Sequence, residues 1–284
     1  MTTETAGSAA ASGNAATDRF RQSGKKSTVA ADAERIDRLA SKLIKAANDI
    51  VLEERVSYEE FNALKAWLIK VGEDGEWPLF LDVWVEHSVE DVATDHREGN
   101  KGSIEGPYYT PDAPEQASPA TISMREDESG TPLLFQGQVR STDGAALSNA
   151  KVELWHADEA GFYSQFAPGI PEWNLRGTFI ADDEGNFKIQ TMQPAPYQIP
   201  TDGACGQLIA AAGWHAWRPA HLHLKVSAPG HELLTAQLYF PGDEHNDDDI
   251  ATAVKPELLL DIQPAAEGNG VQTTYDFMLD PVAK

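Results

Sequence analysis

Residues 218–227 read RPAHLHLKVS, and this segment constrains the interpretation of the whole sequence most strongly. Polar and apolar residues alternate from His221 onward, which predicts a β-strand over His221–Ser227 whose leucine face lies in the core. Because successive strand side chains point to opposite faces, His221 and His223 share the other face, with their Cα atoms about 6.6 Å apart. Two imidazoles at this spacing can bind one metal ion, although such pairs also occur on strands without a metal.

Six further segments of the sequence have the features of strands. They alternate polar and apolar residues or concentrate β-branched and aromatic ones, and they span Leu133–Val139, Lys151–His156, Gly177–Ile180, Asn186–Gln190, Leu233–Phe240 and Thr273–Leu279. Asp143-Gly144 and Asp183-Glu184-Gly185 predict tight turns that join adjacent strands. Because no helices alternate with these strands, we expect residues 101–284 to form an antiparallel β-sandwich.

The preceding region, residues 30–100, has helical periodicity, so the predicted fold class is α+β. A first amphipathic helix is expected from Asp32 onward, with apolar positions at Ile36, Leu39, Leu43, Ala47 and Ile50. Ser57 and Glu60 form the pattern of a capping box at the start of a second helix, which is expected to end at Gly72.

Two shorter helices are expected before the sandwich. Trp77-Pro78 predicts the start of one, because proline is tolerated in the first turn of a helix. Ser88 and Asp91 have the spacing of a cap for the next. Together these elements make residues 30–100 a helical N-terminal region.

The composition limits the classes of partner. Acidic residues number 45 against 22 basic ones, a formal net charge of −23, so the average surface repels phosphate backbones and we expect no nucleic acid to bind. Apolar residues make up 41% of the chain, which suffices to bury a core. Residues 1–29 hold almost no large apolar side chains, and we expect a disordered tail there.

The sequence also predicts where the protein is found. Cys205 is the single cysteine, so no internal disulfide can form. The N-terminus has neither the basic region nor the apolar run of a secretory signal, and no stretch approaches the roughly 20 consecutive apolar residues of a membrane span. We therefore expect a cytoplasmic protein without a membrane span.

A histidine pair needs further ligands to hold a metal ion. The single cysteine excludes thiolate sites, so other histidines, carboxylates or phenolates must complete the site. The remaining histidines are expected to be structural or solvated, because no second one sits at metal spacing: His87, His96, His156, His215, His231 and His245. The acidic run GDEHNDDD at residues 242–249 lacks the spacing of an EF-hand calcium loop, so we expect it to be a solvated loop.

Five fragments of the sequence point to a family when they are taken in order. They are EGPYY at 105–109, AKVELWHA at 150–157, GFYS at 161–164, PAPY at 194–197 and RPAHLH at 218–223. In this order they resemble the intradiol ring-cleavage dioxygenases, and among them the catechol 1,2-dioxygenases most closely. The resemblance implies a β-sandwich catalytic domain at residues 101–284, preceded by a helical dimerisation region at residues 30–100.

The resemblance also implies a cofactor. In this family two tyrosinates and two histidines hold a ferric ion, Fe(3+), and the matching positions are Tyr163, Tyr197, His221 and His223. Tyr163 and His221 correspond to the equatorial ligands, and Tyr197 and His223 to the axial ones. Phenolate is a hard anionic donor suited to a trivalent cation, and imidazole binds iron readily.

The activity implied is cleavage of catechol, or of a substituted catechol, between its hydroxyl-bearing carbons. The reaction uses O2 and gives a cis,cis-muconate in the breakdown of aromatic compounds. Tyr197 and an iron-bound hydroxide correspond to the groups that take the two catechol protons. Arg218 matches a position that stabilises negative charge on the ring, although a surface ion pair is the commoner fate of an arginine. Gln237 matches a polar residue expected to hydrogen-bond near the scissile ring.

Ten residues match positions around the substrate pocket of the family. They are Leu79, Asp82, Ile104, Gly106, Pro107, Tyr109, Ile199, Pro200, Ile250 and Ala251. Leu79, Ile104 and Ile250 would equally suit an ordinary core. The resemblance further implies a homodimer formed through the helical region, where a phospholipid can be held, whereas the amphipathic stripe would also suit packing on its own sandwich.

Three alternatives remain open from the sequence. Residues 150–197 also resemble a transthyretin-like sandwich, which would be a binding module with no need of His221 and His223. Within the family, hydroxyquinol or a chlorocatechol could replace catechol as the substrate. A ferrous site of two histidines and one carboxylate would need a carboxylate ligand that no motif supplies.

Overall fold

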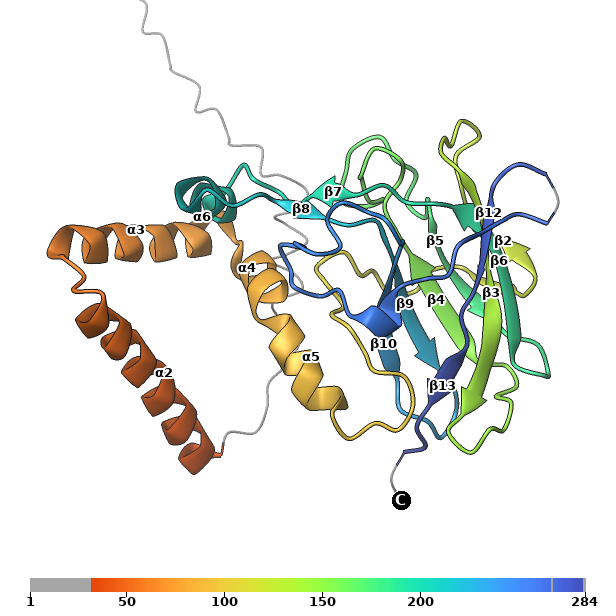
Figure 1. Ribbon diagram of the computed structural model, residues 1–284, viewed down its shortest axis with the longest axis horizontal. Helices are drawn as coiled ribbons and strands as arrows, with labels where there is room; N and C mark the ends of the chain where they lie inside the picture. Colours follow the sequence, from red (N-terminus) through yellow and green to blue (C-terminus); the bar gives the residue numbers. More distant parts are fainter. Residues whose placement is uncertain (1–31, 267, 283–284) are drawn as a thin grey trace, which may run out of the picture.

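The structure, a computed structural model, describes residues 32–266 and 268–282. The disordered tail predicted at residues 1–29 lies outside the described residues. Within them, the chain begins with helices and continues as two β-sheets packed on each other (Figure 1). This order confirms the α+β class with a helical N-terminal region.

The first sheet has the strand order β1-β5-β4-β9-β10. Its strands are β1 (Glu115–Ala117), β5 (Arg176–Ile180), β4 (Lys151–Trp155), β9 (His221–Ser227) and β10 (Leu234–Tyr239). The pairs between β5 and β10 are antiparallel, as predicted, whereas the edge strand β1 runs parallel to β5. The predicted strand from His221 is thus an inner strand of this sheet.

The second sheet has the order β11-β12-β3-β6-β2, and β13 also pairs with β3. Its strands are β11 (Gln263–Pro264), β12 (Val271–Thr274), β3 (Pro132–Ser141), β6 (Asn186–Met192), β2 (Ala120–Thr121) and β13 (Phe277–Leu279). β3 and β6 are antiparallel, as are β11 and β12, but β2 runs parallel to β6, and β12 and β13 run parallel to β3. The expectation of an antiparallel sandwich is corrected at these strands, because each pairs in parallel with a strand that is distant in the sequence, which no hairpin joins to it.

The core lies between the two sheets. Leu154 and Leu222 of the first sheet and Phe135 and Phe187 of the second belong to one apolar cluster, and each is at most 2% exposed. Burying an apolar side chain of this size stabilises the fold by about 2 kcal/mol. The same alternation that sends Leu222 into this core sends the neighbouring histidines to the opposite face of the first sheet.

Both predicted turns form, but each leads from one sheet to the other instead of joining paired strands. After β3, the Ser141 N–H donates to the Ala145 carbonyl at 2.8 Å, and the chain then enters β4 of the first sheet. Between β5 and β6, the Asp182 carboxylate accepts the N–H groups of Glu184 and Asn186. Turn residues determine where the chain reverses, but the sheet that receives the next strand depends on packing of the whole sandwich.

The helical region consists of α2 (Ala33–Glu53), α3 (Tyr58–Asp74), α4 (Trp77–Trp84) and α5 (Glu86–Thr94). The capping box is confirmed, because the Glu60 N–H donates to Ser57 Oγ and the Ser57 N–H donates to Glu60 Oε2. Gly72 does not end α3. The helix continues until Gly75, whose φ of 73° is a left-handed conformation that suits glycine. Ser88 caps no helix, since α5 has already begun before it.

Helices α2 and α3 project away from the sandwich, whereas α4 and α5 lie beside it (Figure 1). No residue of α2 is buried, and Leu43 on its apolar stripe is 73% exposed. In contrast, α4 buries Leu79 and Val83. The apolar stripe of α2 therefore does not pack on its own sandwich.

Three smaller elements complete the described fold. They are β7 (Tyr197–Gln198), which pairs with β8 (Trp217–Arg218), then α6 (Ala204–Ala212) and the 3-10 helix η1 (Pro256–Leu258). Helix α6 packs on α3, where the Trp67 Nε1–H donates to the Ala204 carbonyl at 2.8 Å. Among the residues that the structure describes, no helix has the length and apolar character required to cross a bilayer.

Candidate active site

The register of the first sheet brings five side chains to one face. β9 pairs with β10 so that His221 lies opposite Tyr239 and His223 lies opposite Gln237. On its other side, β4 places Trp155 opposite His223, and the indole stacks on the imidazole with ring centroids 4.9 Å apart. Directly opposite residues of neighbouring strands share a face, so these five positions follow from the register alone.

Two tyrosines reach this face from outside the sheet. Tyr197 begins β7, whose pairing with β8 places it opposite Arg218. Tyr163 lies in the loop that follows β4, and this loop contains Gly161 with a φ of 82°. A Cβ at Gly161 would lie 2.7 Å from the Cβ of Tyr197. Glycine therefore permits both the left-handed backbone and the close approach of the two tyrosine-bearing segments.

The side-chain donor atoms of these segments converge. Nε2 of His223 lies 3.0 Å from Nε2 of His221 and 3.1 Å from Oη of Tyr163. The Tyr197 ring lies beside them, with its centroid 5.4 Å from that of Tyr163 and 5.6 Å from that of His221. All four side chains are buried. Donor atoms that share one ion at about 2.1 Å lie about 3 Å apart when their directions from the ion are perpendicular. The donor spacing of Tyr163, His221 and His223 thus suits a single metal ion, and the Tyr197 ring packs against this group.

The backbone contact of His221 determines which of its ring nitrogens can bind a metal ion. Its Nδ1–H donates to the Pro219 carbonyl at 2.7 Å, so Nε2 carries the lone pair. Burial lowers the pKa of His221 to about 3 and holds the pKa of His223 well below its usual value. Both rings are therefore neutral near pH 7, which is the form that binds a metal ion.

Burial shifts the pKa values of the two tyrosines in the opposite direction to those of the histidines. Burial raises the pKa of Tyr163 well above its usual value. It also raises the pKa of Tyr197, where the Arg218 guanidinium acts in the opposite sense. A bound cation stabilises phenolate, so metal binding and ionisation of these tyrosines would favour each other.

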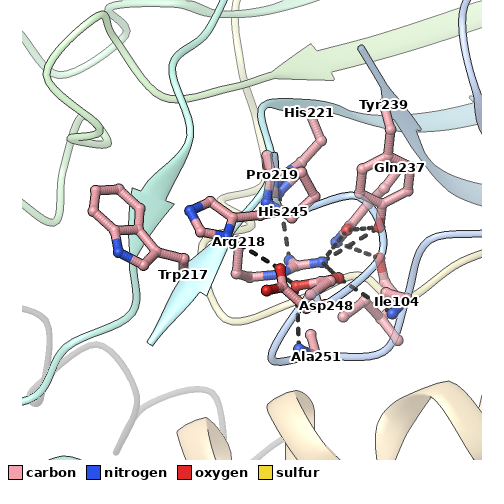
Figure 2. Close-up of polar contacts among 12 residues, drawn as sticks. Ile104, Trp217, Arg218, Pro219, His221, Gln237, Tyr239, His245, Asp248 and Ala251 are labelled. Atoms are coloured by element: carbon pink, nitrogen blue, oxygen red, sulfur yellow. Dashed lines mark hydrogen bonds and ion pairs between the residues drawn. The ribbon is translucent and has the colours of Figure 1, made fainter. Parts of the chain in front are cut away.

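Arg218 is buried beside His221 (Figure 2). Its Nε and Nη2 donate to Oδ1 and Oδ2 of Asp249, both at 3.0 Å. Nη2 also donates to Gln237 Oε1 at 2.9 Å and to Tyr239 Oη at 3.3 Å. Nη1 lies 3.4 Å from His221 Nε2. The structure therefore brings both predicted catalytic side chains, Arg218 and Gln237, to the histidine pair.

Sequence profiles of known families match nearly the whole described chain. The profile described as "Dioxygenase" matches residues 104–281, and the one described as "Catechol dioxygenase N terminus" matches residues 33–101. The chain belongs to the intradiol ring-cleaving dioxygenase family. Both the sandwich with its site and the helical region are thus parts of this family's architecture.

Individual intradiol dioxygenases are similar over most of their length. A chlorocatechol 1,2-dioxygenase of Rhodococcus opacus is 38% identical over 217 residues, which cover 75% of this chain and 84% of the relative. A catechol 1,2-dioxygenase of Acinetobacter baylyi is 36% identical over 237 residues, which cover 80% of this chain and 74% of the relative. The crystal structure of a 3-chlorocatechol 1,2-dioxygenase from Rhodococcus opacus 1CP aligns with a TM-score of 0.86 at 47% identity, covering 88% of this chain and 100% of that one.

The predicted pocket residues of this intradiol dioxygenase come from separate segments. Leu79 and Asp82 lie on α4, Ile104, Gly106, Pro107 and Tyr109 precede β1, Ile199 and Pro200 follow β7, and Ile250 and Ala251 follow the acidic run. The segment before β1 touches the site, because Gln237 Nε2 donates to the Ile104 carbonyl at 3.0 Å. A Cβ at Gly106 would lie 3.4 Å from Cε1 of His223. Pro200 lines a cavity of about 290 Å³ together with Tyr163.

Tyr108 is a site residue that the sequence did not indicate. Its ring stacks on that of Tyr163, with centroids 4.3 Å apart and planes 7° apart. The neighbouring Tyr109, which was the predicted wall residue, donates its hydroxyl proton to Glu153 Oε2 at 2.9 Å. Two adjacent tyrosines in an irregular segment carry no periodicity, so their sequence alone does not indicate which ring faces the site.

Asp249 is a second residue that the sequence missed. The acidic run at residues 242–249 was expected to be solvated, but its last member is buried and pairs with Arg218. Asp243 of the run also accepts the Ala220 N–H at 2.8 Å. A signal for Asp249 did exist: a buried guanidinium requires a counter-charge, so the placement of Arg218 in a buried site predicts an acidic partner.

The other histidines were expected to be structural or solvated. His156 is structural, since its Nδ1 contacts the Ala157 carbonyl at 2.7 Å and its Nε2 contacts Thr191 Oγ1 at 2.6 Å. His96 lies in an exposed contact with Glu232. These positions match the expectation.

His215 and His245 meet at Asp248, although sequence spacing did not bring them together. Their ligand atoms lie within 4.8 Å of one another. His245 Nδ1 is 3.1 Å and His215 Nε2 is 3.3 Å from the Asp248 carboxylate. Because the Trp217 N–H donates to His215 Nδ1 at 3.1 Å, the proton of neutral His215 sits on Nε2 and faces Asp248. Hydrogen bonding therefore accounts for this cluster.

Proposed function

We propose that the protein is an Fe(III)-dependent intradiol dioxygenase that cleaves catechol with O2 to cis,cis-muconate. The observation that carries this proposal is that His223 Nε2 lies 3.0 Å from His221 Nε2 and 3.1 Å from Tyr163 Oη, with the Tyr197 ring packed against that of Tyr163 at 5.4 Å. Two phenolates and two neutral imidazoles suit a hard trivalent cation. These four residues would hold Fe(3+), which when bound makes the ring of a coordinated catechol reactive toward O2.

Tyr197 is proposed to accept a proton from the catechol. It lies opposite Arg218 in the β7-β8 ribbon, and the Arg218 guanidinium favours its ionised form while burial favours the neutral phenol. A group subject to two such opposing effects can exchange a proton during the reaction.

Arg218 is proposed to stabilise negative charge that develops on the substrate ring. Its guanidinium is buried and fixed by Asp249 and Gln237 before substrate arrives. Fixed donors in a buried site contribute about 3 to 4 kcal/mol to catalysis, since they need no reorganisation during the reaction. Gln237 would orient this guanidinium and the His223 ring, which its Nε2 contacts at 3.2 Å.

The purified protein tests the proposal. Tyrosinate bound to Fe(III) gives a red to purple charge-transfer colour, so the iron-loaded protein should be coloured and should convert catechol to a colourless diacid. Tyr163→Phe should lose most of its iron and its colour. A colourless protein that binds no iron would instead support a binding module, and a yellow semialdehyde product would indicate cleavage beside the diol.

A chlorocatechol is the second candidate substrate. It is favoured by the relatives named chlorocatechol 1,2-dioxygenase, whose identity to this chain is 38% in one sequence comparison and 47% in one structural comparison. Values of kcat/KM across catechol, 4-methylcatechol, chlorocatechols and hydroxyquinol distinguish the candidates. If Ala251 lines the pocket, Ala251→Leu should impair 4-substituted catechols more than catechol, and equal effects on both would exclude it from the wall.

We also propose a homodimer formed through α2 and α3, with a phospholipid held between these helices. The proposal is supported by the exposed apolar stripe of α2, which includes Leu43 and Ile44 at 73% and 61% exposure. Extraction of the purified protein with organic solvent, followed by mass spectrometry, tests for the lipid. The division into a helical region at 30–100 and a catalytic domain at 101–284 is part of the same proposal.

A further inference from the structure

Asp249 forms a bidentate ion pair with Arg218 in the interior of the protein. The Asp249 side chain is 2% exposed and that of Arg218 is 3% exposed. Each carboxylate oxygen accepts one guanidinium N–H, Nε on Oδ1 and Nη2 on Oδ2, both at 3.0 Å. Paired contacts of this kind fix the plane and direction of the guanidinium as well as its distance.

The same carboxylate holds the segment that follows it. Its Oδ1 accepts the Ala251 N–H at 3.1 Å, and its Oδ2 accepts the Ala253 N–H at 3.2 Å. The Asp249 carbonyl also accepts the Thr252 N–H at 2.8 Å. Each oxygen of the buried carboxylate therefore has two donors, and residues 250–251, which were predicted to form part of the substrate wall, are tied to the Arg218 ion pair.

The remaining contacts of Arg218 explain what the ion pair achieves. Nη2 is shared with Gln237 and Tyr239, whereas Nη1 faces Nε2 of His221 at 3.4 Å. Because Asp249 holds Nε and Nη2, the remaining nitrogen, Nη1, is the one that lies beside His221. Without the carboxylate, only the bonds of Nη2 to Gln237 and Tyr239 and the contact of Nη1 with His221 would hold the guanidinium, and its orientation would no longer be fixed.

We propose that Asp249 is a positioning residue of the active site, which aims Arg218 at the substrate and fixes the adjoining wall segment 250–251 with the same carboxylate. This inference rests on the proposed function, because it assigns Arg218 a role in that reaction. Asp249 itself touches neither substrate nor metal in this scheme. Its bonds to Arg218 are expected to affect kcat, and its bonds to the wall segment are expected to affect KM.

Asp249→Asn tests the proposal in the iron-loaded enzyme. The asparagine keeps the shape of the side chain but places its N–H₂ group against an N–H donor of the Arg218 guanidinium. We expect kcat for catechol to fall about 100-fold, the effect of misplacing a catalytic group by about 1 Å, while iron per chain stays at the wild-type level. Asp248→Asn is the matched control. Its side chain is 54% exposed and bonds His215 and His245, so kcat should stay within about 2-fold of the wild type.

A double-mutant cycle separates positioning from a merely structural role. In an Arg218→Gln background, Asp249→Asn should lower kcat further by less than about 3-fold, because no guanidinium remains to be aimed. A similar loss in both backgrounds would overturn the proposal, and so would an unchanged kcat in the single variant or a loss of iron in parallel with activity. If Asp249→Asn does not fold, Asp249→Glu, which retains the charge, replaces it in the same cycle with the same criteria.

A failure of the proposed function gives a different result from a failure of the positioning role of Asp249. If the wild-type, iron-loaded protein opens no catechol ring, the reaction has been misassigned, and the pairing is tested by denaturant unfolding of metal-stripped protein. Asp249→Asn should then shift the unfolding equilibrium about 100-fold or more, because it leaves a buried guanidinium without its counter-charge. In the Arg218→Gln background the shift should be less than about 10-fold, and equal shifts in both backgrounds would refute the positioning role.

Discussion

At the scale of single residues, burial determines which protonation state each site residue adopts. His221 and His223 are neutral because burial lowers their pKa values, and Pro219 fixes which nitrogen of His221 is free. Tyr163 and Tyr197 are driven toward the neutral phenol unless a cation is near. The residue types were recognisable in the sequence, but their protonation depends on a buried environment.

Gln237 is expected to support both Arg218 and the segment at Ile104. Gln237→Ala removes the hydrogen bonds of Gln237 to Arg218 Nη2 and to the buried Ile104 carbonyl, so it should destabilise the protein by about 2 kcal/mol. It should also lower kcat about 10- to 100-fold with iron content unchanged, since fixed donors near the reacting groups have effects of that order. Gln138→Ala, on the second sheet, is the control for loss of a glutamine. A loss of iron from Gln237→Ala would make the residue structural.

His156 should make the folded protein sensitive to mild acid. Burial lowers its pKa to about 4, whereas an unfolded histidine titrates near about 6.5. Above the unfolded value both states are neutral and the histidine has no effect. Between about pH 6.5 and 4 the unfolded state binds a proton that the folded state does not, so up to about 3 kcal/mol of stability is lost as the pH falls. Denaturant unfolding of metal-stripped wild type and His156→Gln at pH 7 and pH 5 measures this, and parallel losses in the two proteins would contradict it.

At the scale of elements, the site is assembled by strand register and by one short ribbon. β9 and β10 place His221, His223, Gln237 and Tyr239 by direct pairing, and β7 with β8 places Tyr197 opposite Arg218. The loop after β4 adds Tyr163. A slip of β9 by one residue would move both histidines into the core between the sheets, so correct pairing is a condition for metal binding.

Gly161→Ala should damage the site in a way that its matched control does not. Gly161 and Gly144 have similar positive φ values of 82° and 88°, but a Cβ at Gly161 would lie 2.7 Å from Tyr197 Cβ and one at Gly144 would meet nothing within 4 Å. Both alanine variants should lose about 1 to 2 kcal/mol of stability through backbone strain. Only Gly161→Ala should lose iron and charge-transfer absorption, because Tyr197 must move. Equal iron content in both variants would argue against a role for Tyr197 as a ligand.

At the scale of the whole molecule, the helical region has an apolar surface that its own sandwich does not cover. No described residue of α2 is buried, and Ile36, Leu39, Leu43, Ile44 and Ile50 are all more than half exposed. Exposed apolar patches of this kind mark surfaces of association. The strongly negative chain, with a net charge of −23, makes association depend on such an apolar contact, since charge repels two copies of the protein.

Leu43→Glu is therefore expected to shift the proposed homodimer toward monomer. A carboxylate placed in an apolar interface must be desolvated, which costs several kcal/mol when it finds no partner. Light scattering coupled to size exclusion would measure the mass. Val282→Glu, at an exposed apolar residue of the sandwich, is the control and should leave the mass unchanged. A dimer that survives Leu43→Glu would place the interface elsewhere.

The sequence by itself determined the main strands and the helical region of this protein, and it indicated the candidate ligand residues. Period-two alternation identified the strand from His221, the capping box identified α3, and the ordered fragments indicated the four residues that the structure brings together. Only the tertiary structure determined the parallel edge strands β1 and β2 and the choice of Tyr108 over Tyr109 beside Tyr163. The buried Arg218–Asp249 pair likewise required the tertiary structure. The physical reason is the distance along the chain over which each effect acts. Propensity, capping and periodicity act over a few neighbouring residues. Burial, strand pairing and ion pairs depend on segments that meet only when the chain has folded.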